Sequence, residues 1–276
     1  MSADCPNSLK FCSISNFIRL NLRHPDHLMD LINATTLKLL FTMENTQAMK
    51  KKNKLVIVGC GETCSIAMEI AVSQGSYEIC GFSQEAASSE QGSHLGLPLV
   101  PLQDIRTYFP PEEYQVFVAI SFVWLNQSRC RIYQQLNAQH YVFANIISPL
   151  AYVSPSAQLG NNLLIYDFAS VGTSSIIGNN ATLCSHSIVS HSSHIGAHCY
   201  LAAGATTGGF CQTGERCFIG LQATLSDQSH LQDDSIVSAT SFLPKGKHAS
   251  GLYVGNPAKR QEIDMNDFLR LKRGML

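Results

Sequence analysis

The stretch ATLCSHSIVSHSSHIGAHCYLAAGATTGGF, residues 181–210, carries an aliphatic residue or a threonine at every sixth position. Counting by six from Ile147 to Val237 gives sixteen positions, and all but Thr207 and Thr213 are Ile, Leu or Val. A helix repeats every 3.6 residues and a strand every 2, so neither follows a period of six. The period is typical of a parallel β-helix, in which each hexad is a short strand plus a turn and three hexads make one coil.

Small residues accompany the aliphatic ones. The position after each aliphatic is mostly Gly, Ala, Ser or Cys, as at Gly172 and Gly196, and we expect these residues to permit sharp corners. Cys199, Cys211 and Cys217 occupy another small-residue position, two before the next hexad residue. We interpret them as buried fillers rather than as redox or metal-binding thiols.

The chain before the hexads has a different pattern. A buried run at Leu55–Val58 is followed by a helical pattern that ends at Gly75, and further apolar runs alternate with helical ones up to residue 146. This alternation predicts a parallel sheet flanked by helices. The sequence predicts four parts: 1–52, a leader or poorly ordered extension; 53–146, an α/β Rossmann-like domain; 147–243, a parallel β-helix of hexapeptide repeats; and 244–276, a C-terminal loop and helix.

Composition excludes several classes of function. The net charge is −1, which removes the electrostatic case for nucleic-acid binding. The ten cysteines show no C-x-x-C spacing typical of zinc sites. No segment is apolar and long enough for membrane insertion, and no signal peptide is recognisable at the N-terminus, so we predict a cytoplasmic protein.

The hexad array, the start VGCGETCSIA at residues 58–67 and the ending YVGNPAKR at residues 253–260 together resemble the bacterial sugar acyltransferases with a left-handed β-helix. The sialic acid O-acetyltransferase group is the most similar type, and it includes N-acetyltransferases that act on nucleotide-linked amino sugars. The resemblance covers about residues 53–260. It implies acetyl-CoA as the acyl donor, a sugar or nucleotide-sugar acceptor, a homotrimer with active sites in the clefts between subunits, and no metal. It leaves N- and O-acylation equally open.

Acyl transfer from a thioester needs a base, donors for the developing oxyanion and a slot that orients coenzyme A. Four histidines lie in residues 185–198, and the hexad register places only His191 two residues after an aliphatic, at a corner of the coil. The resemblance puts the catalytic histidine in this register, so we predict His191 as general base. His186, His194 and His198 are predicted to be solvated or to line the cleft.

The resemblance also supplies candidate binding residues. Gly209 lies 18 residues, or one coil, after His191, and its N–H is a candidate donor to the thioester carbonyl; the alternative is a plain turn glycine. The family uses the segment Gly255, Asn256, Pro257 and Lys259 near coenzyme A, with a solvated turn as the alternative.

The loop GCGETC is a partial dinucleotide fingerprint in which Cys64 replaces the third glycine. In the family this loop and the end of the second strand bind the nucleotide of the sugar substrate, here through Gly59, Gly61, Thr63 and Ser83.

Several residues depart from the family pattern. Ser192 stands where many relatives carry an acidic residue that orients the imidazole, and Cys184 stands where many carry asparagine. These departures keep open a non-catalytic protein that binds or assembles on sugar nucleotides. The four histidines keep open a γ-carbonic-anhydrase-like metalloenzyme, which shares the β-helix and holds zinc with three histidines.

Overall fold

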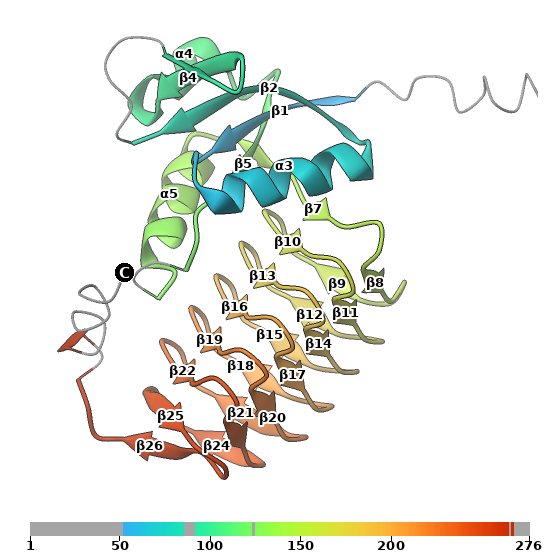
Figure 1. The fold of residues 1–276 in the computed structure, drawn as a ribbon, viewed down its shortest axis with the longest axis vertical. Coiled ribbons are helices and arrows are strands. Elements are labelled where there is room, and N and C mark those ends of the chain that lie inside the picture. Colours follow the sequence, from blue (N-terminus) through green and yellow to red (C-terminus); the bar gives the residue numbers. More distant parts are fainter. Residues whose placement is uncertain (1–51, 86–91, 123–124, 265, 268–276) are drawn as a thin grey trace, which may run out of the picture. The chain divides into compact units, whose positions relative to one another are not determined.

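A computed structural model describes residues 52–85, 92–122, 125–264 and 266–267 (Figure 1). By contacts the chain divides into residues 1–51 and residues 52–276. The predicted leader lies outside the described residues except for Lys52, as does nearly all of the predicted C-terminal helix.

The first part of the described chain is an α/β unit. Its central sheet has the strand order β3-β4-β2-β1-β5-β6, with all pairs parallel except β3 with β4. The alternation of apolar runs and helical patterns thus produced the parallel sheet that it predicts. The elements are β1 Asn53–Val58, α3 Glu62–Gln74, β2 Tyr77–Gln84, β3 Gly92–His94, β4 Leu97–Pro101, the 3-10 turn η2 Leu102–Asp104, α4 Ile105–Tyr108, β5 Gln115–Val118, α5 Gln127–Ala138 and β6 Val142–Phe143.

Each face of this sheet is covered by an apolar layer. Residues of β1 and β5 pack on one side against α4 and α5, through Ile105, Ile132 and Leu136. On the other side, α3 packs in one cluster with Ile146 and Leu164 of the first coils. The α/β unit therefore shares a core with the start of the repeat region.

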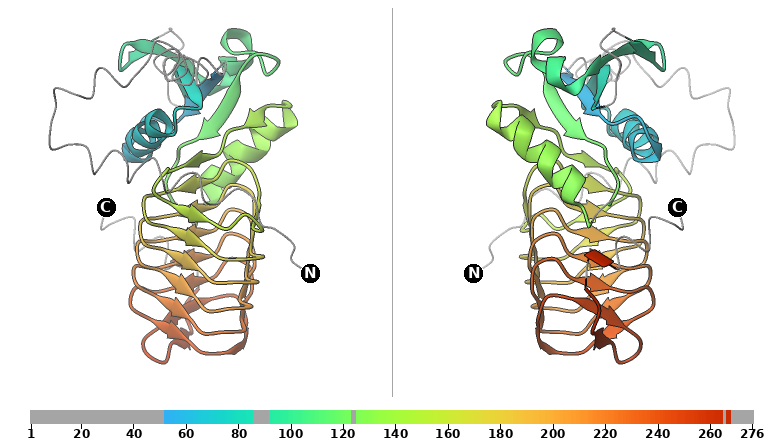
Figure 2. Two further views of the ribbon diagram at one scale, coloured as in Figure 1. Left: turned by 90° about the vertical axis from the view of Figure 1, so that its right-hand side faces the viewer. Right: turned by 90° about the vertical axis from the view of Figure 1, so that its left-hand side faces the viewer.

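The repeat region folds as a parallel β-helix with three faces (Figure 2). Face 1 consists of β7 Ile146–Ile147, β10 Leu164–Ile165, β13 Thr182–Leu183, β16 Tyr200–Leu201, β19 Phe218–Ile219, β22 Ile236–Val237 and β25 Leu252–Val254, with β26 Lys259–Gln261 antiparallel at the edge. Face 2 consists of β8 Tyr152–Val153, β11 Ser170–Val171, β14 Ile188–Val189, β17 Thr206–Thr207, β20 Thr224–Leu225 and β23 Phe242–Leu243. Face 3 consists of β9 Gln158–Leu159, β12 Ile176–Ile177, β15 His194–Ile195, β18 Gln212–Thr213, β21 Ser229–Leu231 and β24 Gly246–His248.

Each strand pairs with the strand 18 residues later, as a three-hexad coil requires, up to β21 and β22. The aliphatic hexad residues point inward and form one buried column, with Cys199, Cys211 and Cys217 inside it. The fold class is confirmed: an α/β unit followed by a left-handed parallel β-helix of hexapeptide repeats. The ladders extend past residue 243, through β24 and β25.

The expected reason for the small residues was wrong. The left-handed backbone falls on the third turn residue, as at Asn180, His186 and Ser192, not on the glycine that follows each aliphatic. A Cβ on Gly172 would lie 2.8 Å from the backbone nitrogen of His191 in the next coil. At the glycines the residue is small because the coils stack at the strand spacing, which leaves little room there for a side chain between turns.

Candidate active site

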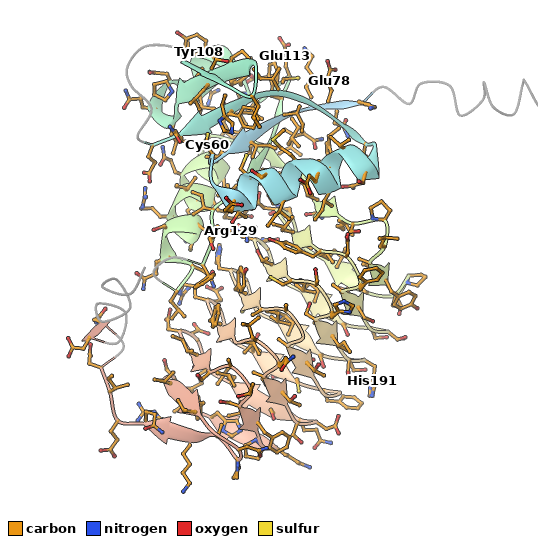
Figure 3. The ribbon with its side chains drawn as sticks, viewed as in Figure 1. Cys60, Glu78, Tyr108, Glu113, Arg129 and His191 are labelled. Atoms are coloured by element: carbon orange, nitrogen blue, oxygen red, sulfur yellow. The ribbon has the colours of Figure 1, made fainter. Side chains whose placement is uncertain are left out.

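His191 sits in the turn Ser190–Ser193, which joins face 2 to face 3; we call this column of turns corner 2–3. Its side chain is exposed and lies at the outer edge of the stacked coils, pointing away from their interior (Figure 3). The structure thus places it at a corner, as the hexad register predicts. Its role as a base stays a prediction.

Gly209 makes the space that the imidazole occupies. A Cβ built on Gly209 would lie 2.6 Å from both Cε1 and Nε2 of His191. The next residue, Phe210, meets the imidazole edge to face, with ring centres 5.1 Å apart and an interplanar angle of 87°. Its N–H also donates to the His191 carbonyl at 3.1 Å. The imidazole of His191 therefore packs against Gly209 and Phe210 of the next coil.

The N–H of Gly209 is not free for a thioester oxygen. It donates to Oδ1 of Asp227, one coil further along corner 2–3, at 2.5 Å. The same arrangement recurs at the corner between faces 3 and 1, where Asn179 Oδ1 accepts from the N–H of Asn161 at 3.0 Å. A short acceptor side chain on one coil thus caps the preceding coil, and the predicted oxyanion role of Gly209 conflicts with this bond.

The other three histidines do not share the turn of His191 at corner 2–3. His194 begins β15 on face 3 and is exposed. His186, at corner 1–2, stacks on Phe168 with ring centres 5.2 Å apart. His198, at corner 3–1, is buried; its Nδ1 bonds to Asn180 Nδ2 at 2.8 Å, and burial lowers its pKa to about 4. Among the described residues, no group of three or more His, Cys, Asp or Glu side chains is placed to hold a metal ion.

The segment Gly255–Lys259 forms a turn at the end of the coils. Gly255 has φ 100°, and its N–H donates to Ser241 Oγ at 3.0 Å. The N–H of Ala258 donates to the carbonyl of Phe242 at 2.7 Å. Asn256 and Pro257 are exposed and joined by a cis peptide bond, and Lys259 is exposed in β26 at the edge of face 1. The turn is therefore anchored by its backbone, and its side chains are left available.

A groove of about 520 Å³ runs along face 1 beside corner 1–2. Small residues of successive turns line its floor, among them Ala202, Ala203, Gly220, Ser238 and Ala239. One end is aromatic: Phe122 lies with ring centres 5.1 Å from Tyr200 and 4.9 Å from Phe218. The groove spans several coils. Its last lining residues, Ser238 and Ala239, lie shortly before Ser241, which accepts the hydrogen bond from the N–H of Gly255. The groove therefore ends near the turn at Gly255.

The loop after β1 lies at the carboxyl ends of the parallel strands of the α/β unit. Gly59 has φ 121°, and a Cβ there would lie 2.6 Å from the carbonyl oxygen of Ala119, so only glycine fits. Its N–H donates to the Ser83 carbonyl at 2.7 Å. Gly61 caps α3, and Thr63 lies in that helix's first turn. Ser83 is fully buried, and its hydroxyl has no hydrogen-bond partner among the described residues.

An ion pair beside this loop is a feature that the sequence reasoning missed. Glu85, directly after β2, accepts two hydrogen bonds of 2.7 Å from Arg131 of α5. The bidentate pair joins the end of β2 to the helix that follows β5. An acidic residue at the end of the second strand was the available signal, because this is where dinucleotide-binding sheets meet a ribose.

Arg129, also in α5, is fully buried against the coils (Figure 3). Its guanidinium donates to Thr182 Oγ1 and to the Asn162 carbonyl, the latter at 3.0 Å, while Nε has no partner among the described residues. Burial lowers its pKa to about 10. These bonds attach α5 to the turn before β10 and to β13, the second and third strands of face 1.

One chain does not bring the predicted residues together. His191 and Gly209 share corner 2–3, the Gly255 turn continues the side of face 1 and corner 1–2, and Gly59, Gly61, Thr63 and Ser83 lie in the α/β unit. No helix within the described part of the chain has the length and apolar character needed to cross a bilayer.

Residues 54–136 match the family model of the PglD N-terminal domain. Curated proteins gave no match. Among solved structures, a histidine-to-asparagine variant of perosamine N-acetyltransferase from Caulobacter crescentus, in complex with CoA and GDP-perosamine, is 25% identical with a TM-score of 0.67 over 76% of this chain and 98% of that chain.

The acetyltransferase domain of PglB from Neisseria gonorrhoeae FA1090, in complex with acetyl coenzyme A, is also 25% identical, with a TM-score of 0.65 over 76% of this chain and 100% of that chain. WeeI from Acinetobacter baumannii AYE shares the fold at 18% identity and a TM-score of 0.61, over 76% and 100%. In both its α/β unit and its coils, the chain is similar to the sugar acetyltransferases of the left-handed β-helix, hexapeptide-repeat family.

Proposed function

We propose that this protein transfers an acetyl group from acetyl-CoA to an amino or hydroxyl group of a sugar that is linked to a nucleotide, with His191 as general base. The observation that carries the proposal is the placement of an exposed imidazole over a glycine on corner 2–3, in a fold that matches structures solved with CoA and GDP-perosamine. The neutral imidazole removes the acceptor's proton as nitrogen or oxygen attacks the thioester carbon. The carbon–sulfur bond then breaks, and His191 returns the proton to the sulfur of the departing coenzyme A.

The nucleotide of the acceptor is proposed to bind at the loop after β1. Ligands of open parallel sheets bind at the carboxyl ends of the strands where the strand order reverses, and β1 lies between β2 and β5 at that point. The backbone at Gly59 and Gly61 permits close approach, and Thr63 lies at the helix N-terminus, where phosphate binds well. The Ser83 hydroxyl, which has no partner within the described residues, supplies a buried donor.

A homotrimer completes the proposed site. In one chain His191 lies at corner 2–3 and the groove of face 1 lies at corner 1–2, so they meet only if two subunits place these corners together. The arm of coenzyme A then lies in the groove, with Gly255, Asn256, Pro257 and Lys259 at its far end. In this proposal Gly209 contributes to the coenzyme A site by leaving space for the imidazole of His191. We also propose that the enzyme is cytoplasmic.

The test is a screen of nucleotide-linked amino sugars with acetyl-CoA, followed by release of free thiol. We expect His191→Asn to lower turnover about 100- to 10,000-fold, the range that general-base catalysis contributes, and to leave acetyl-CoA binding unchanged. His140→Asn, an exposed histidine of the α/β unit, is the matched control and should be fully active. Near-normal turnover of His191→Asn would refute the base assignment. Tight acetyl-CoA binding without thiol release for any acceptor would favour the non-catalytic binding protein.

A further inference from the structure

The outward side of face 3 carries a polar stripe that begins beside His191. We define it by its four outward residues, His194, Gln212, His230 and Lys247. Each lies opposite the next in the strand register: His194 with Gln212, Gln212 with His230, and His230 with Lys247. The stripe therefore runs parallel to the axis of the coils, away from the α/β unit.

Face 2 provides an internal comparison, because it is built from the same hexads. Its outward residues carry no charge at any position: Tyr152, Ser170, Ile188, Thr206, Thr224 and Phe242. Two imidazoles and an ammonium in register on face 3 are therefore not a general property of the coils. They distinguish face 3 from face 2, the other face that meets at the corner of His191.

All four residues of the stripe line a pocket of about 340 Å³, together with His248 and Asp233. Lys247 is exposed, and its ammonium has no ion pair in the described part of the chain. The carboxylate of Asp233 is already engaged: Oδ1 accepts from the N–H of Glu215 at 2.9 Å, and Oδ2 lies 3.7 Å from Arg216. The pocket thus offers an ammonium that has no ion pair among the described residues, while its carboxylate, Asp233, accepts a backbone hydrogen bond and shares Arg216 with Glu215 and Asp234.

The length of the stripe matches one part of the proposed donor. Three ladder steps separate β15 from β24, which at the usual strand spacing is about 14 Å. In coenzyme A about a dozen bonds join the sulfur to the first phosphorus, and at 3.80 Å per three bonds these span roughly 15 Å when extended. A thioester held at His191 therefore brings the pyrophosphate to the level of His230 and Lys247.

We propose that Lys247 and His230 bind the phosphates of coenzyme A and position its thioester at His191, with Gln212 beside the amides of the arm. This inference rests on the proposed function, from which it takes the donor and the site of the thioester. It adds a second lysine to the proposed site of coenzyme A, in which Lys259 lies at the edge of face 1. In a trimer the two lysines stand on opposite walls of one cleft, each from a different subunit.

The test compares ligands that share the arm but differ in phosphate. We expect Lys247→Ala to weaken the binding of coenzyme A about 10-fold by calorimetry, and to leave the affinity for S-acetylpantetheine, which lacks every phosphate, unchanged. The kcat with saturating acetyl-CoA should stay near that of the wild type, and Lys247→Arg should restore most of the affinity. Lys52→Ala, an exposed lysine of the α/β unit, is the charge-matched control.

Two results overturn the inference: equal affinity of wild type and Lys247→Ala for coenzyme A, or an equal loss for coenzyme A and S-acetylpantetheine. Dephospho-CoA, which lacks the 3′-phosphate, locates the contact. If dephospho-CoA binds the wild type as well as coenzyme A does and binds Lys247→Ala more weakly, the contact is with the pyrophosphate. If Lys247→Ala does not weaken the binding of dephospho-CoA, the contact is with the 3′-phosphate. Binding is measured without an acceptor, so failure of the transfer reaction and failure of the phosphate contact are separate outcomes.

Discussion

At the scale of single residues, His191 is held by contacts with the next coil and not by a carboxylate. In the described part of the chain, no side chain hydrogen-bonds to either imidazole nitrogen, and the ring is placed by the bare Cα of Gly209 and the edge of Phe210. No carboxylate of the described residues therefore orients the imidazole in place of the acidic residue that the family pattern has at the position of Ser192. Packing restricts the ring, and a small change in packing should move it.

We therefore predict that Gly209→Ala lowers kcat about 100-fold, the scale that a 1 Å misplacement produces. The new methyl group would meet the far side of the imidazole, which can rotate away, so the melting temperature should change by no more than about 2 °C. Activity and thermal unfolding of the same preparation check both parts. The control is Gly196→Ala, whose methyl group would overlap the backbone of Gly214 and should destabilise the coils. Full activity of Gly209→Ala would show that the glycine serves only the turn.

At the scale of elements, corner 3–1 forms the seam between α5 and the coils. Its third turn residues form a ladder, in which Asn162 Nδ2 donates to Asn180 Oδ1 at 2.6 Å and Asn180 bonds to His198. From α5, Tyr133 meets the His198 ring edge to face, with centres 5.5 Å apart. Arg129 adds the bonds to Asn162 and Thr182. The seam thus depends on a neutral imidazole at His198.

This arrangement predicts a loss of stability in acid. Burial, with Arg129 and Arg216 nearby, lowers the pKa of His198 to about 4, whereas the unfolded chain has the ordinary value of 6.5. Between these values the unfolded state binds more protons, so the free energy of unfolding falls as the pH drops below 6.5 and levels off below pH 4. At 1.36 kcal/mol per pKa unit the loss is about 3 kcal/mol. In urea unfolding, His198→Asn should remove this part of the pH dependence, because asparagine continues the ladder without titrating. Identical pH profiles for the two proteins would rule out His198 as its source.

Elements also show what the sequence could and could not predict. The period of six predicted every strand of the three faces from Ile147 to Val237, because one inward aliphatic per strand is a local signal. It also placed His191 at a corner. The spacing of 18 residues also places Asp227 next to Gly209, but it does not show that the carboxylate accepts from this N–H, because that depends on the side-chain conformation. The stripe of face 3 had a readable signal, because its first three outward residues recur at 18-residue spacing.

At the scale of the whole molecule, the three faces differ in what covers them. Segment 125–138 packs on face 1, where Leu125 contacts Ile236 and Leu252. Face 3 carries the polar stripe. Face 2 has only uncharged outward residues, and Tyr152 and Ile188 remain 59% and 41% exposed. If face 2 of each subunit lies toward the three-fold axis of the proposed trimer, corners 1–2 and 2–3 of neighbouring subunits meet, which joins the groove to His191.

We therefore predict that Ile188→Lys dissociates the trimer. Three added charges would face each other around the axis, where they would lose hydration without gaining a partner. The matched control is Ile176→Lys, at an equivalent outward position of face 3 with 37% exposure, which should remain trimeric. Light scattering after gel filtration measures the mass of both proteins, and thiol release measures their activity. Because the site needs corners from two subunits, Ile188→Lys should lose activity in proportion to dissociation, although its own His191 is untouched. A monomer that retains full activity, or dissociation by Ile176→Lys instead, would place the interface on another face.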